Sequence, residues 1–103
     1  MIRHTILFKL KAEVPKHELE RIFTDILALT NKFHGVSSIT GGTCHFHEQD
    51  SHLFSHGISI DFDNKAARDA FLNDQLSWPP VKDHIMNITE GGYKGIINFD
   101  FRE

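Results

Sequence analysis

The sequence has few of the residues that mark several large classes of protein. It contains one cysteine, which excludes an internal disulfide. Its 11 Lys and Arg residues are outnumbered by 14 Asp and Glu residues, and they form no basic cluster that could neutralise nucleic-acid phosphates. No stretch approaches the roughly 18 apolar residues of a membrane span, and residues 2–11 alternate instead of forming a signal-peptide apolar run. We therefore expect a cytoplasmic protein that binds neither membranes nor nucleic acid.

The length of 103 residues fits a single domain, residues 1–103. Two residue types are abundant: nine phenylalanines accompany one tyrosine and one tryptophan, and there are eight histidines. Protonation of all eight would change the formal charge from −3 to +5, so the histidines dominate the charge just below neutral pH.

Hydrophobic periodicity predicts four strands and two helices. Strict alternation indicates strands, and apolar residues at i, i+3, i+4 and i+7 indicate helices. The predicted strands are residues 2–11, 36–47, 54–62 and 93–101; one helix spans about residues 15–33, and a second is capped by Asp63 or Asn64 and takes a new turn at Ser77. Gly41 and Gly42 predict a bulge or a close backbone approach.

This element order is β-α-β-β-α-β. It predicts an α+β, ferredoxin-like fold, in which a four-stranded antiparallel sheet in the order 4-1-3-2 carries two helices on one face. The other face is expected to be too apolar for solvent, with Thr5, Leu7, Ser59, Ile96 and either Ile39 or the set Val36, Cys44 and Phe46. A second copy could cover it, giving a homodimeric α+β barrel; the alternative is a monomer with a small exposed patch.

Two histidines occupy inward-facing strand positions. The first and third strands are expected to be adjacent and parallel, which places His4 beside His56 at one end of an aromatic space. A neutral imidazole can take up a proton and return it, so both are candidate catalytic residues. The candidate ligand-binding residues are Phe8, Phe23, Ile58, Phe71, Trp78 and Phe99. The alternative is that each histidine is a hydrogen-bonded core residue.

Three segments resemble the stress-responsive A/B barrel family, often called Dabb: residues 2–11, 55–62 and 97–101. The likeness covers nearly the whole chain. It implies a homodimeric α+β barrel with a pocket between sheet and helices in each subunit. His4 and His56 match the family's pocket histidines.

One family member, a plant polyketide cyclase, uses a Tyr and a His of an H-P-x-H stretch for acid–base chemistry. The Tyr position falls on Phe71 here, and residues 73–81 contain no histidine. The loss of the hydroxyl argues against cyclisation by that mechanism.

Three functions are therefore considered. The first is binding of an apolar or aromatic small molecule, with His-mediated proton transfer of lyase, cyclase or isomerase type. The second is a non-catalytic stress-associated dimer whose interior is filled by phenylalanines, and the third is a cofactor-free monooxygenase. A cavity of roughly 300 Å³ or more with both imidazoles at its wall would favour binding or catalysis.

The remaining histidines and the cysteine suggest little chemistry. His45 and His47, with His52 or Glu48, could hold a metal, but their spacing matches no structural zinc pattern. Cys44 has no base at a defined distance and is not expected to act as a nucleophile. We expect no metal and no cofactor.

Overall fold

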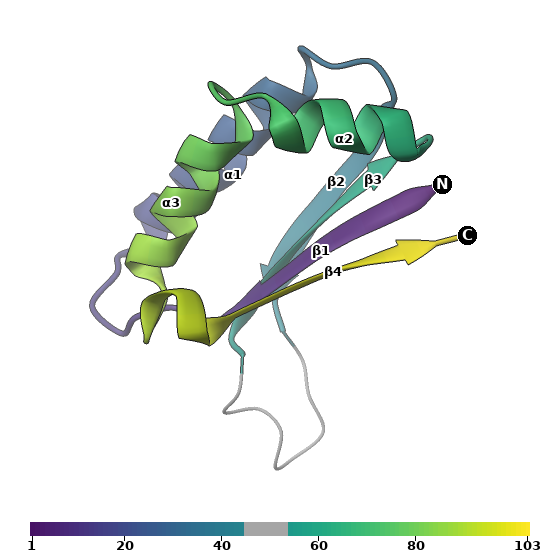
Figure 1. Ribbon diagram of the computed structural model, residues 1–103. Coiled ribbons are helices and arrows are strands. Elements are labelled where there is room, and N and C mark those ends of the chain that lie inside the picture. The colour runs from purple at the N-terminus through teal and green to yellow at the C-terminus, as the bar shows by residue number, and fades with distance from the viewer. Residues whose placement is uncertain (45–53) are drawn as a thin grey trace.

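The computed structural model describes residues 1–44 and 54–103 (Figure 1). The elements are β1 (Ile2–Phe8), α1 (Lys16–Thr30), β2 (Val36–Thr43), β3 (His56–Phe62), α2 (Lys65–Asn73), α3 (Trp78–Ile88), the 3₁₀ helix η2 (Gly92–Gly95) and β4 (Ile96–Arg102). The sheet order is β2-β3-β1-β4, every neighbouring pair is antiparallel, and the α-helices lie on one side of the sheet. This confirms the predicted ferredoxin-like α+β fold.

The predicted parallel pairing of β1 and β3 is wrong. Helix α1 returns the chain so that β2 runs in the same direction as β1, and β3 then runs opposite to β2. The register therefore places His4 opposite Ile60, and Phe8 opposite His56. At about 3.4 Å per residue, the two histidines lie about 14 Å apart along the sheet, at opposite ends rather than side by side.

The helix boundaries differ from the prediction in detail. Pro15 precedes α1 in an extended conformation, and the helix ends three residues before the predicted residue 33 because residues 31–33 form a turn. The side chain of Asn64 accepts a hydrogen bond from the Ala67 amide, which confirms the predicted N-cap of α2. The extended backbone of Asp74 separates α2 from a third helix, α3, where one continuing segment was expected.

The core lies between the helices and the inward face of the sheet. Phe71 of α2 is fully buried, and its ring lies 5.2 Å from Phe33, 5.5 Å from Phe62 and 5.6 Å from Trp78, measured between ring centroids. Burial of each large apolar side chain contributes about 1.5–3 kcal/mol. The largest fully buried side chains are Phe8, Phe62, Phe71, Ile22, Ile26, Ile60, Ile85 and Thr89.

The predicted inward orientation of Phe99 is also wrong. Phe99 pairs with Thr5, whose side chain points away from the helices, whereas Ile96, Asn98 and Asp100 pair with the inward residues of β1. Both alternating sets of β4 contain apolar residues, so periodicity could not decide which of them faces the core.

The face of the sheet that no helix covers, here called the open face, is consequently more aromatic than expected. Three residues that were expected on the open face pack against the core instead: Val36, Ile39 and Ile96. Phe46 lies outside the described residues. The apolar members of the open face are Leu7, Ile97, Phe99 and Phe101.

Within residues 1–44 and 54–103, no helix is both long and apolar enough to cross a membrane.

Candidate functional site

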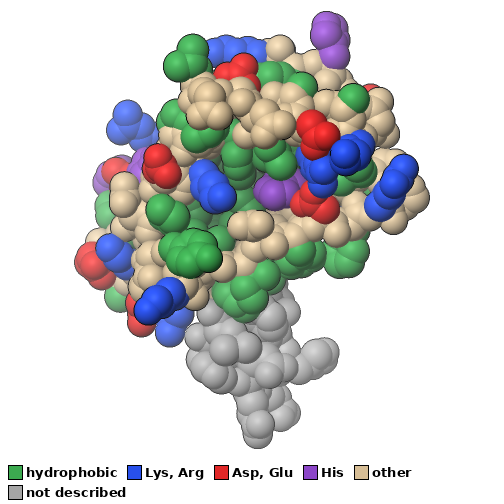
Figure 2. Space-filling model, viewed as in Figure 1, with side chains coloured by type: hydrophobic (Ala, Val, Ile, Leu, Met, Phe, Trp, Pro, Cys, Tyr) green, Lys and Arg blue, Asp and Glu red, His purple; other side chains and the backbone are tan. Residues whose placement is uncertain are grey.

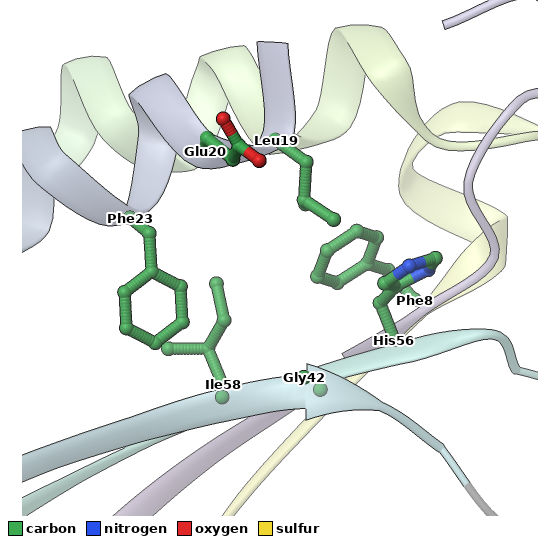
Figure 3. Close-up of a pocket in the computed structure, with 9 residues that line it drawn as sticks. Phe8, Leu19, Glu20, Phe23, Gly42, His56 and Ile58 are labelled. Carbon is green, nitrogen blue, oxygen red and sulfur yellow. The ribbon is translucent and has the colours of Figure 1, made fainter. Parts of the chain in front are cut away.

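A pocket opens between α1 and the inward face of the sheet (Figure 3). Its volume is about 140 Å³. Phe8 and His56 lie together at one end and Phe23 and Ile58 at the other, while Leu19 and Glu20 extend from α1 above. The lining residues are Phe8, Leu19, Glu20, Phe23, Gly41, Gly42, His56, Gly57 and Ile58. The site is therefore an apolar slot with a carboxylate and an imidazole as its polar side chains.

A glycine of β2 allows helix α1 to approach the sheet here. A Cβ atom at Gly41 would lie 2.1 Å from Cε2 of Phe23, far inside van der Waals contact. The Phe23 ring therefore rests directly on the backbone of β2, which confirms the predicted close approach at the glycine pair. The irregularity of the strand lies elsewhere, between Val36 and Ser38.

His56 is held in place by its neighbours on β1 and by the residue that precedes it. Its Nδ1 atom lies 2.8 Å from the Ser55 hydroxyl, which also accepts a hydrogen bond from the Leu10 amide at 2.9 Å. The imidazole stacks on Phe8, with ring centroids 5.9 Å apart. Burial lowers the pKa of His56 below its usual 6.5, so the ring is neutral at neutral pH.

His4 lies in a different environment, away from the pocket. It is 8% exposed, its Nδ1 lies 2.6 Å from Oδ1 of Asp100, and its ring meets the Trp78 ring edge-on at 5.8 Å. Arg68 of α2 donates a hydrogen bond to the other oxygen of Asp100. In Figure 2, a histidine side chain is seen among apolar side chains, with acidic and basic side chains next to it.

Asp100 is the centre of this charged group. Burial is the largest influence on its pKa and acts to raise it, but the hydrogen bonds from His4 and Arg68 together outweigh burial and lower the pKa below the usual 3.8. The carboxylate is thus ionised and links β1, β4 and α2. The two predicted catalytic histidines therefore belong to separate sites.

The structure divides the predicted ligand-binding residues into three groups. Phe8, Phe23 and Ile58 line the pocket. Phe71 and Trp78 are packed within the core, and Phe99 lies on the open face.

Several lining residues were missed by sequence reasoning. Leu19 was one of them; it lies four residues before the predicted Phe23 on α1, a spacing that places both on one helix face and could have identified the helical wall. Nothing in the pattern distinguished Glu20 from other exposed helix residues.

The remaining candidates are the predicted metal ligands and Cys44. His45, His47, Glu48 and His52 lie outside the described residues, and the described part of the chain contains no group of three or more potential metal ligands. Cys44 lies beside Gly57. A Cβ atom built on Gly57 would be 3.7 Å from the Sγ atom of Cys44. Burial raises the pKa of the Cys44 thiol, which makes it a poorer nucleophile.

Comparison with solved structures places this fold among known proteins. A dimeric ferredoxin-like protein of unknown function from Jannaschia sp. CCS1 has a TM-score of 0.87 at 19% identity, with 99% of this chain and 98% of that chain covered. Hydroxynitrile lyase from Passiflora edulis has a TM-score of 0.76 at 16% identity, with 97% of this chain and 90% of that chain covered. A cofactor-independent oxygenase from Streptomyces nogalater has a TM-score of 0.70 at 13% identity, covering 99% and 91%.

These identities are too low to transfer an activity, and no curated protein sequence matches the chain. The model of the stress responsive A/B barrel domain matches residues 2–102. The chain therefore belongs to the stress responsive A/B barrel family.

Proposed function

We propose that this protein binds a small apolar or aromatic molecule in the pocket between α1 and the sheet. The observation that carries the proposal is an apolar slot of about 140 Å³ with a single neutral imidazole, His56, at its wall. Apolar cavities of roughly 150 Å³ bind benzene, whereas drug-sized ligands occupy about 300 Å³ or more. The pocket is smaller than the roughly 300 Å³ expected from the sequence, and one imidazole lines it instead of two, so neither part of that criterion is met. The ligand is accordingly the size of one ring.

Proton transfer at His56 is the reaction that this geometry favours. A neutral imidazole with a lowered pKa can accept a proton from a bound molecule and return it. The hydroxynitrile lyase with the same fold supports a lyase-type reaction, and the oxygenase keeps the monooxygenase alternative open. His4 has its Nδ1 bonded to Asp100 and lies outside the pocket, so its proposed role is to stabilise the fold.

A ligand screen tests the proposal. We expect single-ring compounds to raise the melting temperature of the wild type, because a ligand that binds only the folded state stabilises it. His56→Ala should weaken that shift, while His17→Ala, which removes an exposed histidine of α1, should leave it unchanged. If no compound of this size raises the melting temperature, the alternative of a structural protein with a filled interior is favoured.

We also propose that the protein is a homodimer in which two open faces pack together. Ile97 is 47% exposed and Phe101 is 59% exposed on this face, and water-exposed aromatic patches of this kind are typical of interfaces. In the same row of the sheet as Phe101, the carboxylate of Asp61 is held by the Arg3 guanidinium at 2.7 Å and by the Ser38 hydroxyl at 2.8 Å, so these polar groups would remain hydrogen-bonded when covered. The dimeric structure from Jannaschia supports a homodimer.

A further inference from the structure

We infer that the pocket takes single-ring ligands that carry a positively charged amine on a short arm, with the ring in the apolar slot and the ammonium group beside the carboxylate of Glu20. This inference rests on the proposed function, because it names the class of molecule that the same pocket binds. It follows from the position of Glu20 on α1 and from the charges around the slot.

Glu20 lies where the pocket meets the solvent. Its side chain lines the slot and is nevertheless 65% exposed. In Figure 3 it extends from α1 above the space between Phe23 and His56. A carboxylate in this position keeps most of its hydration, and it can pair with a cation at the opening without either charge being buried.

The apolar wall next to this carboxylate can hold a ring. Glu20 and Phe23 are three residues apart on α1, a spacing that places their Cβ atoms about 5–6 Å apart on one helix face. Phe23 rests on the β2 backbone at Gly41 and forms one end of the slot. A ring packed against Phe23 therefore reaches the carboxylate through an arm of one or two carbon atoms.

The slot offers no positive charge that would repel an ammonium group. Among the described residues that line it, Glu20 is the only acidic one, and no Lys or Arg is present. Burial lowers the pKa of His56, so its imidazole is neutral at pH 7.5. One carboxylate thus dominates the electrostatic potential of the pocket, which favours a cation over a neutral molecule of the same shape.

Among the described residues, Lys16 is the cation that pairs with Glu20, and it holds the carboxylate weakly. Its Nζ atom lies 4.0 Å from Oε1 of Glu20, and the two side chains are 88% and 65% exposed. Exposed ion pairs of this kind contribute little to stability. The carboxylate is therefore available to a ligand, and Lys16 competes with that ligand for it.

NMR titration of isotope-labelled protein at pH 7.5 with two probes of the same shape tests the inference. Benzylamine is positively charged at this pH, and benzyl alcohol carries a neutral hydroxyl in place of the ammonium group. We expect benzylamine to bind about 1.5- to 5-fold more tightly, the range of an exposed ion pair, and the preference should shrink in about 0.5 M NaCl because salt screens it. Both probes should shift the amide signals of Gly41 and Gly42, which line the slot.

Two pairs of variants test whether Glu20 causes the preference. Glu20→Gln should reduce the affinity for benzylamine to that for benzyl alcohol. Asp25→Asn removes the same charge from an exposed position of α1 outside the pocket and should retain the preference. Lys16→Gln should strengthen benzylamine binding about 2-fold, because it removes the competing cation. Lys32→Gln, which removes a positive charge from an exposed position after α1, should leave the affinity unchanged.

The outcomes distinguish failure of this inference from failure of the proposed function. Equal affinity of the two probes for the slot of the wild type, or a preference for benzylamine that persists in Glu20→Gln, would overturn the charge selection while supporting the slot as a binding site for single rings. Signal shifts confined to residues outside the slot, or no binding of either probe, would overturn both.

Discussion

The Nδ1 atom of His4 lies 2.6 Å from Oδ1 of Asp100, and this contact joins the first strand of the sheet to the last. Arg68 on α2 holds the second oxygen of the same carboxylate, so one ionised side chain connects three elements that are far apart in the sequence. The contact is largely buried, which makes the loss of any one partner costly, because the remaining groups stay desolvated.

Substitution of this carboxylate is expected to destabilise the fold. Asp100→Asn removes the charge that accepts hydrogen bonds from His4 and Arg68, and it should lower the free energy of unfolding at pH 7 by about 1–3 kcal/mol, as measured by urea titration. Asp69→Asn removes another carboxylate bonded to Arg68, one that is more exposed than Asp100, and should cost less. Equal losses in the two variants would contradict a central role for Asp100.

The same carboxylate predicts a loss of stability in acid. Its pKa is lower in the folded protein than the usual 3.8, so its contribution is fully present above about pH 4. As the pH falls through the folded-state pKa, the carboxylate is protonated and the contribution is lost. Between pH 5 and pH 2 the wild type should therefore lose more stability than Asp100→Asn, and parallel curves for the two proteins would contradict this assignment.

His56 predicts a second pH dependence, near neutrality. Burial lowers its pKa in the folded protein, so the unfolded chain takes up a proton first as the pH falls below 6.5 and the folded state loses stability. Melting temperatures between pH 8 and pH 5 should fall less in His56→Gln than in the wild type. His17→Gln, which changes an exposed histidine, should retain the wild-type slope. A slope that is unchanged in His56→Gln would show that burial of this ring does not affect its titration.

Most of the fold could be predicted from the sequence, because alternation of apolar and polar residues identifies the strands and helical spacing identifies the helices. The inward set of β1 and the Asn64 cap of α2 follow directly from local pattern and side-chain chemistry. The orientation of β4 could not be predicted, because Ile96 and Ile97 are equally suited to either face. Their placement depends on η2, which replaces the predicted start of the strand.

The candidate site was less predictable, because it depends on relative direction and packing. His4 and His56 occupy inward positions as expected, but the antiparallel register separates them. Phe23 lines a pocket while Phe71 fills the core, although both are inward-facing phenylalanines on helices. Whether such a ring lines a cavity or fills it depends on the side chains that surround it in space.

Packing of α1 on β2 can be tested at the glycine pair. In Gly41→Ala the new methyl group would overlap the Phe23 ring, so the ring must move; we expect a loss of about 1–3 kcal/mol in the free energy of unfolding and weaker binding of ring-sized ligands. Gly42→Ala is the control for backbone freedom in the unfolded chain, because its methyl group meets nothing within 4 Å. Its stability should change by less than about 0.5 kcal/mol. Equal stability of the two variants would contradict the close approach of Phe23.

The proposed dimer can be tested at the most exposed aromatic residue of the open face. Light scattering of the wild type at micromolar concentration should give twice the 11.8 kDa mass of the chain. Phe101→Asp replaces an exposed ring of the proposed apolar contact with a charge, opposite Arg3 on the neighbouring strand. It should give the monomer mass, because apolar contact area is lost and the carboxylate must be desolvated between two sheets. Leu76→Asp introduces the same charge at a position that is 91% exposed in the connection between α2 and α3, and it should remain dimeric. A wild-type mass of 11.8 kDa would contradict the dimer, and dissociation of both variants would place the interface elsewhere.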